Sequence, residues 1–351
     1  MPRRQPVSRC VSVTGLRRVP TGNHRPRARS LALFAALACF AALASPGVAD
    51  AATGANTVKA TSTVVSVSGA GQRLTWAPPA GYAKFPVTKV TATSSLTIVD
   101  ARGGDVRVQL AADHAVGPVT IQNCRNAVLI GGRITVLASA KVNGYDQRAL
   151  MIKNCTGTVH VEGLQITGNV LGSQADAIAA QSPKAVLQIQ NVRADGLRGG
   201  QSGNHADVFQ PWGGLRAFRI DRLTGSSNYQ GITTTQSTGL IGSGTIKHAN
   251  ITSSGVTPVD KGGYFVWVNC NDRYPLSLSD VYVSGRSGRT LGASVWPRSD
   301  ATSCASAIAG NVATWPGRAG LTGGVRSGTP PTGDFVPAGS VGLGYTSPGY
   351  L

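Results

Sequence analysis

The chain is poor in charged residues and in aromatic residues, which make up 14% and 6% of its 351 residues. Lys and Arg are not clustered with interleaved aromatic side chains, and this argues against a nucleic-acid partner. No Cys/His spacing resembles a zinc site. Between residues 100 and 300 there is no sustained i, i+3, i+4, i+7 apolar pattern, so a helical protein is excluded over that range.

Long apolar runs are also scarce. The run from Leu31 to Ala44 spans about fourteen residues and is too short to cross a bilayer comfortably. It follows eight arginines, from Arg3 to Arg29, and precedes Ala49-Asp50-Ala51, which matches an A-x-A cleavage site. Residues 1–51 are therefore predicted to be a signal peptide, with a start codon further downstream as an alternative beginning. The mature protein is expected to be secreted, with no membrane segment.

Acidic residues are few, and this becomes informative once the signal is removed. Residues 52–351 carry 25 basic and 14 acidic residues, a net charge of +11. Such a charge favours polyanions, for example polysaccharides of uronic acids. The alternative interpretation is that a basic surface is an ordinary property of exported proteins.

A phrase that ends in a polar bend recurs about every thirty residues. Its copies are Ile121-Gln122-Asn123-Cys124, Ile152-Lys153-Asn154-Cys155, Ile189-Gln190-Asn191-Val192, Ile220-Asp221-Arg222-Leu223, Ala249-Asn250-Ile251 and Leu278-Ser279-Asp280-Val281. A fixed period in this range indicates stacked units, and the alternating apolar residues within each unit indicate short strands. The pattern predicts a parallel β-solenoid in which stacked Asn side chains bond one another.

The repeat also organises the rest of the chain. Residues 52–94 are expected to cap the first coil, residues 95–310 to form the coils, and residues 311–351 to be a Gly/Pro-rich tail, structureless or wrapped. The longest interval between bends, from Asn154 to Asn191, predicts an insertion near Gly172–Pro183, on what is often the binding face of a solenoid.

Four cysteines remain after signal removal. Cys124 and Cys155 occupy the same place in successive copies of the repeat, so a disulfide between them is geometrically allowed. Cys270 and Cys304 are predicted to form the second disulfide, because an even count in an oxidising compartment favours bonds. Two free thiols stacked in the core are the alternative for the first pair.

One segment departs from the repeat, Asn204-His205-Ala206-Asp207-Val208-Phe209-Gln210-Pro211-Trp212-Gly213-Gly214. If Val208 points into the coil, Asp207 and Phe209 face away from it. If Phe209 is the buried residue, Asp207 points inward with it, at a cost for a charge. A local bend can break this alternation, so both arrangements stay open.

Spacing from the bends stacks Asp176 one coil away from Asp207, and either Gln230 or Gln236 continues the row. Two carboxylates one coil apart either share a Ca²⁺ or have one raised pKa. A pair with split pKa values supplies a general acid and a general base for glycoside cleavage. The predicted catalytic residues are His205, Asp207, Asp176 and Gln210, and the predicted substrate-binding residues are Trp212, Tyr229, Gln230, Arg216 and Lys261.

The coils with bend asparagines, the export signal and the row of polar residues on a strand face make residues 95–310 similar to the pectate-lyase-like right-handed parallel β-helix superfamily. The resemblance implies an all-β, single-stranded right-handed parallel β-helix that acts on polysaccharides, with substrate lying along the coils. Signatures of its known enzymes are missing, namely the set Asn-Thr-Asp, Asp-Asp, Gly-His-Gly and Arg-x-Lys and the run Asp-Pro-His-Glu. No catalytic residue is therefore carried over from the superfamily.

These observations together predict a secreted monomer that acts as a lyase on an extracellular or plant polysaccharide, polyanionic ones included. A glycoside hydrolase and a non-catalytic glycan-binding or structural protein are the alternatives. The expected cofactor is none or Ca²⁺ held by Asp176 and Asp207.

Overall fold

The computed structural model describes residues 72–138, 148–236, 239–255 and 263–351, all within the compact unit that spans residues 63–351. The predicted signal peptide and Lys261 lie outside the described residues. The described chain has many strands and almost no helix, and it forms a right-handed parallel β-helix, as predicted. Helical structure in the described part is short: η1 (Tyr82–Lys84) and α1 (Leu291–Ser294).

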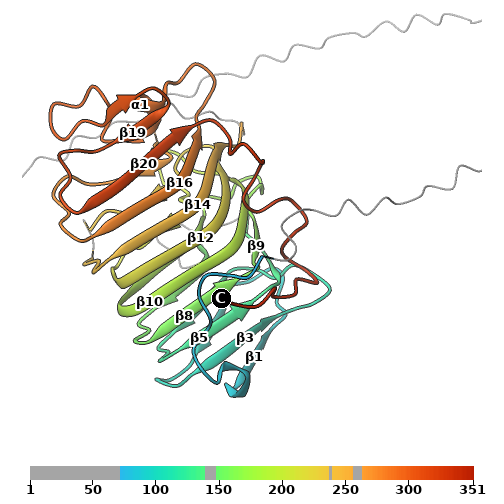
Figure 1. The fold of residues 1–351 in the computed structure, drawn as a ribbon. Coiled ribbons are helices and arrows are strands. Elements are labelled where there is room, and N and C mark those ends of the chain that lie inside the picture. The colour runs from blue at the N-terminus through green and yellow to red at the C-terminus, as the bar shows by residue number, and fades with distance from the viewer. Residues whose placement is uncertain (1–71, 139–147, 237–238, 256–262) are drawn as a thin grey trace, which may run out of the picture. The chain divides into compact units, whose positions relative to one another are not determined.

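Two faces of the β-helix matter for function. The long-strand face consists of β1 (Val87–Val90), β3 (Val106–Leu110), β5 (Ala127–Ile130), β6 (Arg133–Thr135), β8 (Thr158–Glu162), β9 (Gln165–Thr167), most of β10 (Asp176–Leu197), β12 (Leu215–Ser227), β14 (Gly244–Ser253), β16 (Leu276–Ser284) and β20 (Leu321–Ser327). Figure 1 shows the strands of this face side by side from β1 to β20.

The short-strand face consists of β2 (Thr97–Asp100), β4 (Val119–Gln122), β7 (Arg148–Lys153), the first residues of β10, β11 (Phe209–Gln210), β13 (Ile232–Thr233), β15 (Val266–Trp267) and β17 (Val295–Trp296). Strands of the two faces alternate along the chain, so each coil contributes to both. Aliphatic side chains from both faces fill one continuous core between them.

The bends of the coils form two rows of left-handed residues. Asn123 and Asn154 close β4 and β7 with φ of 52° and 54°, and the Asn154 side-chain amide donates to the Asn123 oxygen at 3.4 Å. Asn191 belongs to a second row inside the long-strand face, in register with Gly163 before it and Arg222 after it. That row continues to His248 and Asp280, all with positive φ.

The prediction of one row through all six bends is therefore wrong. Asn154 and Asn191 lie on different rows, so the long interval between them is not the length of one coil. The insertion predicted near Gly172–Pro183 is absent as such, because β10 begins at Asp176 and continues through this range as a strand.

Both ends of the described chain lie on the long-strand face. The range assigned to the cap contains β1, which already pairs with β3. The range assigned to the tail contains β19 (Val312–Thr314) and β20, and β18 (Ala307–Ala309) pairs with β19 as a hairpin. The last residues then cross the long-strand face: Leu74 N–H donates to the Gly349 carbonyl at 2.8 Å, and Leu351 N–H donates to the Leu74 carbonyl at 2.9 Å.

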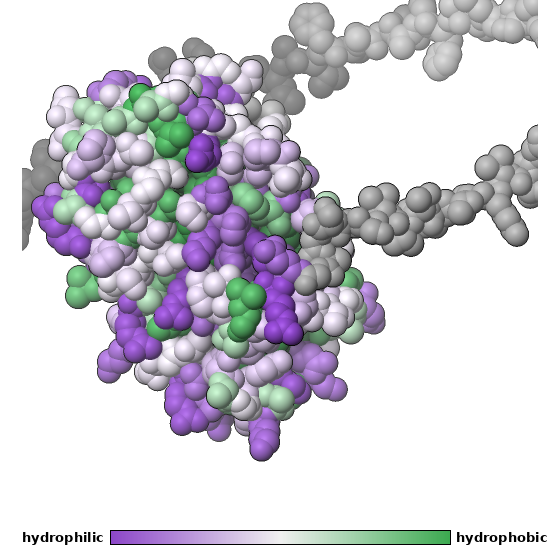
Figure 2. All heavy atoms as spheres, in the orientation of Figure 1, coloured by the Kyte–Doolittle hydropathy of each residue, from purple (hydrophilic) through white to green (hydrophobic). Residues whose placement is uncertain are grey.

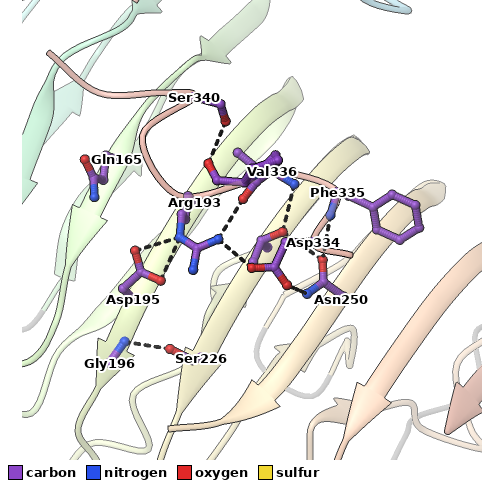
Figure 3. A network of polar contacts seen from close by, with 12 residues as sticks. Gln165, Arg193, Asp195, Gly196, Ser226, Asn250, Asp334, Phe335, Val336 and Ser340 are labelled. Atoms are coloured by element: carbon purple, nitrogen blue, oxygen red, sulfur yellow. Dashed lines mark hydrogen bonds and ion pairs between the residues drawn. The ribbon is translucent and has the colours of Figure 1, made fainter. Parts of the chain in front are cut away.

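Polar contacts hold this C-terminal segment, residues 330–351, against the sheet. Arg193 is 2.7 Å from Asp334, whose other oxygen accepts a bond of 2.9 Å from Asn250 (Figure 3). Further along, the hydroxyls of Tyr345 and Tyr350 donate to the two oxygens of the buried Glu162 at 2.9 Å and 2.6 Å. Figure 2 shows the molecule from the same side as Figure 1. The surface on this side is a mixture of hydrophilic and weakly hydrophobic residues with small separate apolar patches.

Two histidines on the long-strand face contact acidic residues. His160 contacts Glu162 at 2.9 Å, two residues along the same strand, and His248 contacts Asp221 at 2.7 Å. Aligning all six bends on one row does not predict either contact, because that alignment does not show which polar side chains share the outer side of the long-strand face.

Both predicted disulfides are present. Cys124–Cys155 joins adjacent coils with the Cα atoms 4.4 Å apart, and Cys270–Cys304 joins the last coils with the Cα atoms 5.8 Å apart. The alternative of free thiols at Cys124 and Cys155 is thereby excluded, and two disulfides suggest an oxidising compartment. No helix in the described residues is long and apolar enough to span a membrane.

Candidate functional site

Near the start of three neighbouring strands of the short-strand face, two core residues follow each other directly in the sequence. These doublets are Ala149-Leu150, Ala177-Ile178 and Val208-Phe209, and all six residues belong to the core. Regular strand alternation would send one residue of each doublet outward. The structure shows the third possibility considered for this segment, a local break in the alternation, because Val208 and Phe209 are both buried.

The residue before each doublet is charged: Arg148, Asp176 and Asp207. Asp176 pairs in register with Arg148, and the pairing of Ile178 with Phe209 sets Asp207 beside Asp176. Asp176 and Asp207 are fully buried, and the Arg148 guanidinium lies 5.8 Å from the ring centre of Trp212, a residue that is 40% exposed. The predicted stacking of the two carboxyl groups is thus found in the structure.

The two carboxyl groups are shielded from solvent, with no measurable exposure of either side chain. One oxygen of Asp176 accepts bonds from the Asp207 backbone N–H at 2.9 Å and the Asn204 amide at 3.0 Å. Its other oxygen lies 3.7 Å from Arg148. Asp207 accepts a hydrogen bond from Thr233, and the second oxygens of both Asp176 and Asp207 have no hydrogen-bond partner within the described part of the chain.

Burial raises the pKa of both groups because it disfavours the charged form. For Asp207 burial and then the negative charge of Asp176 raise the pKa well above its usual value, whereas the Thr233 hydrogen bond opposes the shift. For Asp176 burial again raises the pKa, against the nearby Arg148 charge and the hydrogen bonds described above. Of the two carboxyl groups, Asp207 is therefore the one whose charged form is disfavoured more strongly, because the charge of Asp176 adds to the effect of burial.

The surroundings of the pair do not fit Ca²⁺. A calcium ion takes six to eight oxygen ligands, whereas the groups that contact these carboxyl oxygens are an arginine, an amide N–H, a backbone N–H and one hydroxyl, that of Thr233. Among the described residues there is no group of three or more His, Cys, Asp or Glu side chains that could hold a metal ion.

The other predicted site residues are placed as follows. Gln230, not Gln236, is connected to the pair, because its amide donates to Thr233 at 2.9 Å and Thr233 donates to Asp207. His205 is half-buried and its ring stacks against Tyr229, with the centroids 5.3 Å apart. Tyr229 is only 7% exposed and presents little surface to a sugar.

Three further residues lie at or near the surface. Gln210 is half-buried on β11, Trp212 is exposed with the Arg148 guanidinium 5.8 Å from its ring centre, and Arg216 is exposed on β12. Arg216 belongs to the long-strand face, where its neighbour Leu215 pairs with Ser182, and not to the strands of the short-strand face that carry the carboxyl pair.

A cluster of aromatic residues at the C-terminal end of the short-strand face was not anticipated. Trp267 and Trp296 pair in register on β15 and β17, and their ring centroids lie 5.4 Å apart. Tyr264 lies 5.0 Å from the Trp296 ring and 5.6 Å from the Trp267 ring, and Arg289 stacks over Tyr264 at 5.2 Å. The three aromatic side chains, called here the aromatic platform, are half-buried.

The strand pattern explains why the platform faces outward. Trp267 lies between the core residues Val266 and Val268, and Trp296 follows the core residue Val295. The positions that precede the two tryptophans in this row of the short-strand face are Thr233, which pairs with Trp267, and Gln210. Gln210 lies next to Thr233 because Phe209 pairs with Ile232. The sequence alone could have predicted the platform, because its two tryptophans each follow a valine and lie one period of the repeat apart.

Comparison of the chain with protein-family models, curated proteins and solved structures gives no match. Function is therefore argued from the geometry of the short-strand face itself.

Proposed function

We propose that this protein is an exported β-helix protein that binds polysaccharide on its short-strand face, with the aromatic platform as the central contact. The observation that carries the proposal is the outward stack of Trp267 and Trp296 in adjacent coils, joined by Tyr264. Aromatic rings combine an apolar face with little conformational entropy, which makes them strong contact residues in binding sites.

The residues next to the platform suit a sugar. A pyranose ring has an apolar face that stacks on an indole and hydroxyl groups at its edge that need hydrogen-bond partners. Asn269 and Thr235, half-buried and 3.2 Å apart, flank Trp267 along the chain and on the neighbouring coil. Arg289 adds a positive charge beside Tyr264 and favours acidic sugars.

Export and superfamily membership are part of the same proposal. The apolar run after eight arginines and the two disulfides support a secreted protein. The parallel coils and the bonded Asn123–Asn154 pair support membership of the pectate-lyase-like β-helix superfamily.

The experiment is affinity electrophoresis of the mature protein through gels that contain neutral glucans or polyuronates. Trp296→Ala and Trp267→Ala should each weaken binding by about tenfold or more, which corresponds to ~1.4 kcal/mol per factor of ten. Tyr282→Ala is the matched control, because Tyr282 is a half-buried aromatic residue on β16 of the other face. Equal retardation of all three variants and the parent chain would overturn the proposal.

A second candidate function is cleavage of the bound polysaccharide by Asp176 and Asp207, as a lyase or a glycoside hydrolase. One observation favours it: the buried carboxyl pair has raised pKa values, with the Arg148 guanidinium 3.7 Å from Asp176 and 5.8 Å from the ring centre of the exposed Trp212. A protonated carboxyl group is the form that a general acid requires. Because both groups are buried, substrate reaches them only if the side chains that cover them move aside.

Incubation with the polysaccharides retained in the gels tests this candidate. Unsaturated product detected by ultraviolet absorbance identifies a lyase, and new reducing ends without absorbance identify a hydrolase. Either activity should vanish in Asp207→Ala. The absence of both products from every retained polysaccharide would reject cleavage and leave binding intact.

A further inference from the structure

We infer that the Cys270–Cys304 disulfide positions the aromatic platform, so that sugar affinity depends on this bond and not on the Cys124–Cys155 bond. The inference rests on the proposed function, since it assigns a control of the same site.

The strands that carry the platform are too short to fix its register by themselves. β15 and β17 have two residues each, and Trp267↔Trp296 is the last of their two pairs. Two further backbone bonds extend this pairing, from Phe265 N–H to the Ser294 carbonyl at 2.9 Å and from Val268 N–H to the Trp296 carbonyl at 3.0 Å. By contrast, β14 and β16 on the long-strand face pair over eight residues. A short ladder contributes few hydrogen bonds against slippage.

The disulfide lies where this ladder stops. Cys270 follows Trp267 by three residues, and Cys304 closes the loop that leaves Trp296. Hydrogen bonds fix the start of that loop, from Trp315 to the Pro297 carbonyl at 3.2 Å and from Ser299 N–H to the Gly292 carbonyl at 3.1 Å. The bond between Cys270 and Cys304 therefore ties the far end of the Trp296 loop to the segment directly after Trp267.

The chain offers a matched control in its other disulfide. Cys124–Cys155 closes 31 residues and Cys270–Cys304 closes 34, so both restrict the unfolded chain to a similar degree. Cys124 and Cys155 follow β4 and β7, and the strands β10, β11 and β13 lie between β7 and β15. Removing either bond should cost similar stability, but only one removal should disturb the platform.

The two bonds also differ in access to reductant. Cys124 and Cys155 are each 1% exposed, whereas Cys270 and Cys304 are half-buried. Low concentrations of dithiothreitol should therefore reduce Cys270–Cys304 first, with release of two thiols for each protein molecule and oxidation of one dithiothreitol.

The test compares Cys270→Ser/Cys304→Ser with Cys124→Ser/Cys155→Ser at a temperature where far-ultraviolet circular dichroism shows both folded. Near-ultraviolet circular dichroism reports the packing of the tryptophans, and calorimetric titration with the oligosaccharide of the best retained polysaccharide reports affinity. The first variant should change the aromatic spectrum and bind at least fivefold more weakly, and the control should change neither. Partial reduction of the parent protein should reproduce the first variant when two thiols have been released.

Equal affinities and equal aromatic spectra for the two variants would overturn the inference. If Trp296→Ala leaves sugar binding unchanged, the proposed function fails instead. The aromatic spectrum then still decides whether the disulfide positions the rings.

Discussion

The backbone N–H of Asp207 donates to the carboxylate of Asp176 at 2.9 Å, so the two acidic residues of adjacent coils are linked through the main chain of one and the side chain of the other. This contact leaves Asp176 as the acceptor and Asp207 as the group whose charge is least favourable. The buried pair is therefore a source of pH-dependent stability.

The Asp207→Asn variant should remove that pH dependence. Because the pKa of Asp207 is raised in the folded state, its protonated form contributes stability that is fully present below the unfolded pKa of about 3.9 and is lost as pH rises through the folded pKa. Asparagine keeps an oxygen for Thr233 and cannot ionise. The variant should match the parent chain in acid and exceed its melting temperature at alkaline pH.

Thermal unfolding between pH 4 and pH 9 checks this expectation. Asp113→Asn is the control, because the Asp113 side chain is 86% exposed and its replacement should shift stability little at any pH. If the difference in melting temperature between the parent chain and Asp207→Asn stays constant across this pH range, the pKa of Asp207 is not raised.

Tyr350→Phe should loosen the C-terminal segment. It removes the hydroxyl that donates to Glu162 at 2.6 Å, and a hydrogen bond to a charged group is worth about 1.5–3 kcal/mol. Because Tyr350 is half-buried, a loss near the lower end of this range is expected in urea unfolding at neutral pH.

The loss should shrink in acid. Burial acts to raise the pKa of Glu162, but hydrogen bonds from His160, Ser347, Tyr350 and Tyr345 together hold it below its usual value. Stability from a depressed pKa is present above the unfolded pKa of about 4.3 and disappears as pH falls through the folded value. Tyr282→Phe on the same face serves as control, and a Tyr350→Phe effect that does not change with pH would contradict this account.

Asp280 offers a test of the second row of bends. Its φ is 51°, a left-handed conformation in which glycine is free of the Cβ conflict that other residues meet. Asp280→Gly should therefore be more stable than Asp280→Ala by about 1 kcal/mol, the reverse of the order expected inside a strand. Urea unfolding of the two variants measures the difference, and a more stable alanine variant would show that the bend does not require this conformation.

The repeat alone was sufficient to predict the fold and the stacking of Asp176 with Asp207. Asn191 and Arg222 are register partners, and Asp176 precedes Asn191 by the same number of positions as Asp207 precedes Arg222. The second row of bends was not predictable in this way, because asparagine and aspartate mark both rows and the sequence does not say which row a bend joins. Asn154 and Asn191 look equivalent and are not.

Burial was the other limit. The doublet Val208-Phe209 places two core residues in succession, and no alternating pattern predicts such a break. Asp207 is consequently fully buried and does not lie on an open surface. Trp267 and Trp296, by contrast, were within reach of sequence reasoning, since their spacing matches one coil of the repeat.

The most direct test of the central claim is oxidative footprinting of the tryptophans, read by mass spectrometry, with and without saturating oligosaccharide from the best retained polysaccharide. Trp76, which is half-buried and contacts Gln190 on the long-strand face, is the internal reference. Binding at the aromatic platform predicts that sugar slows oxidation of Trp267 and Trp296 severalfold and leaves Trp76 unchanged. Unchanged oxidation of Trp267 and Trp296 in the presence of bound sugar would contradict the claim and place the binding site elsewhere.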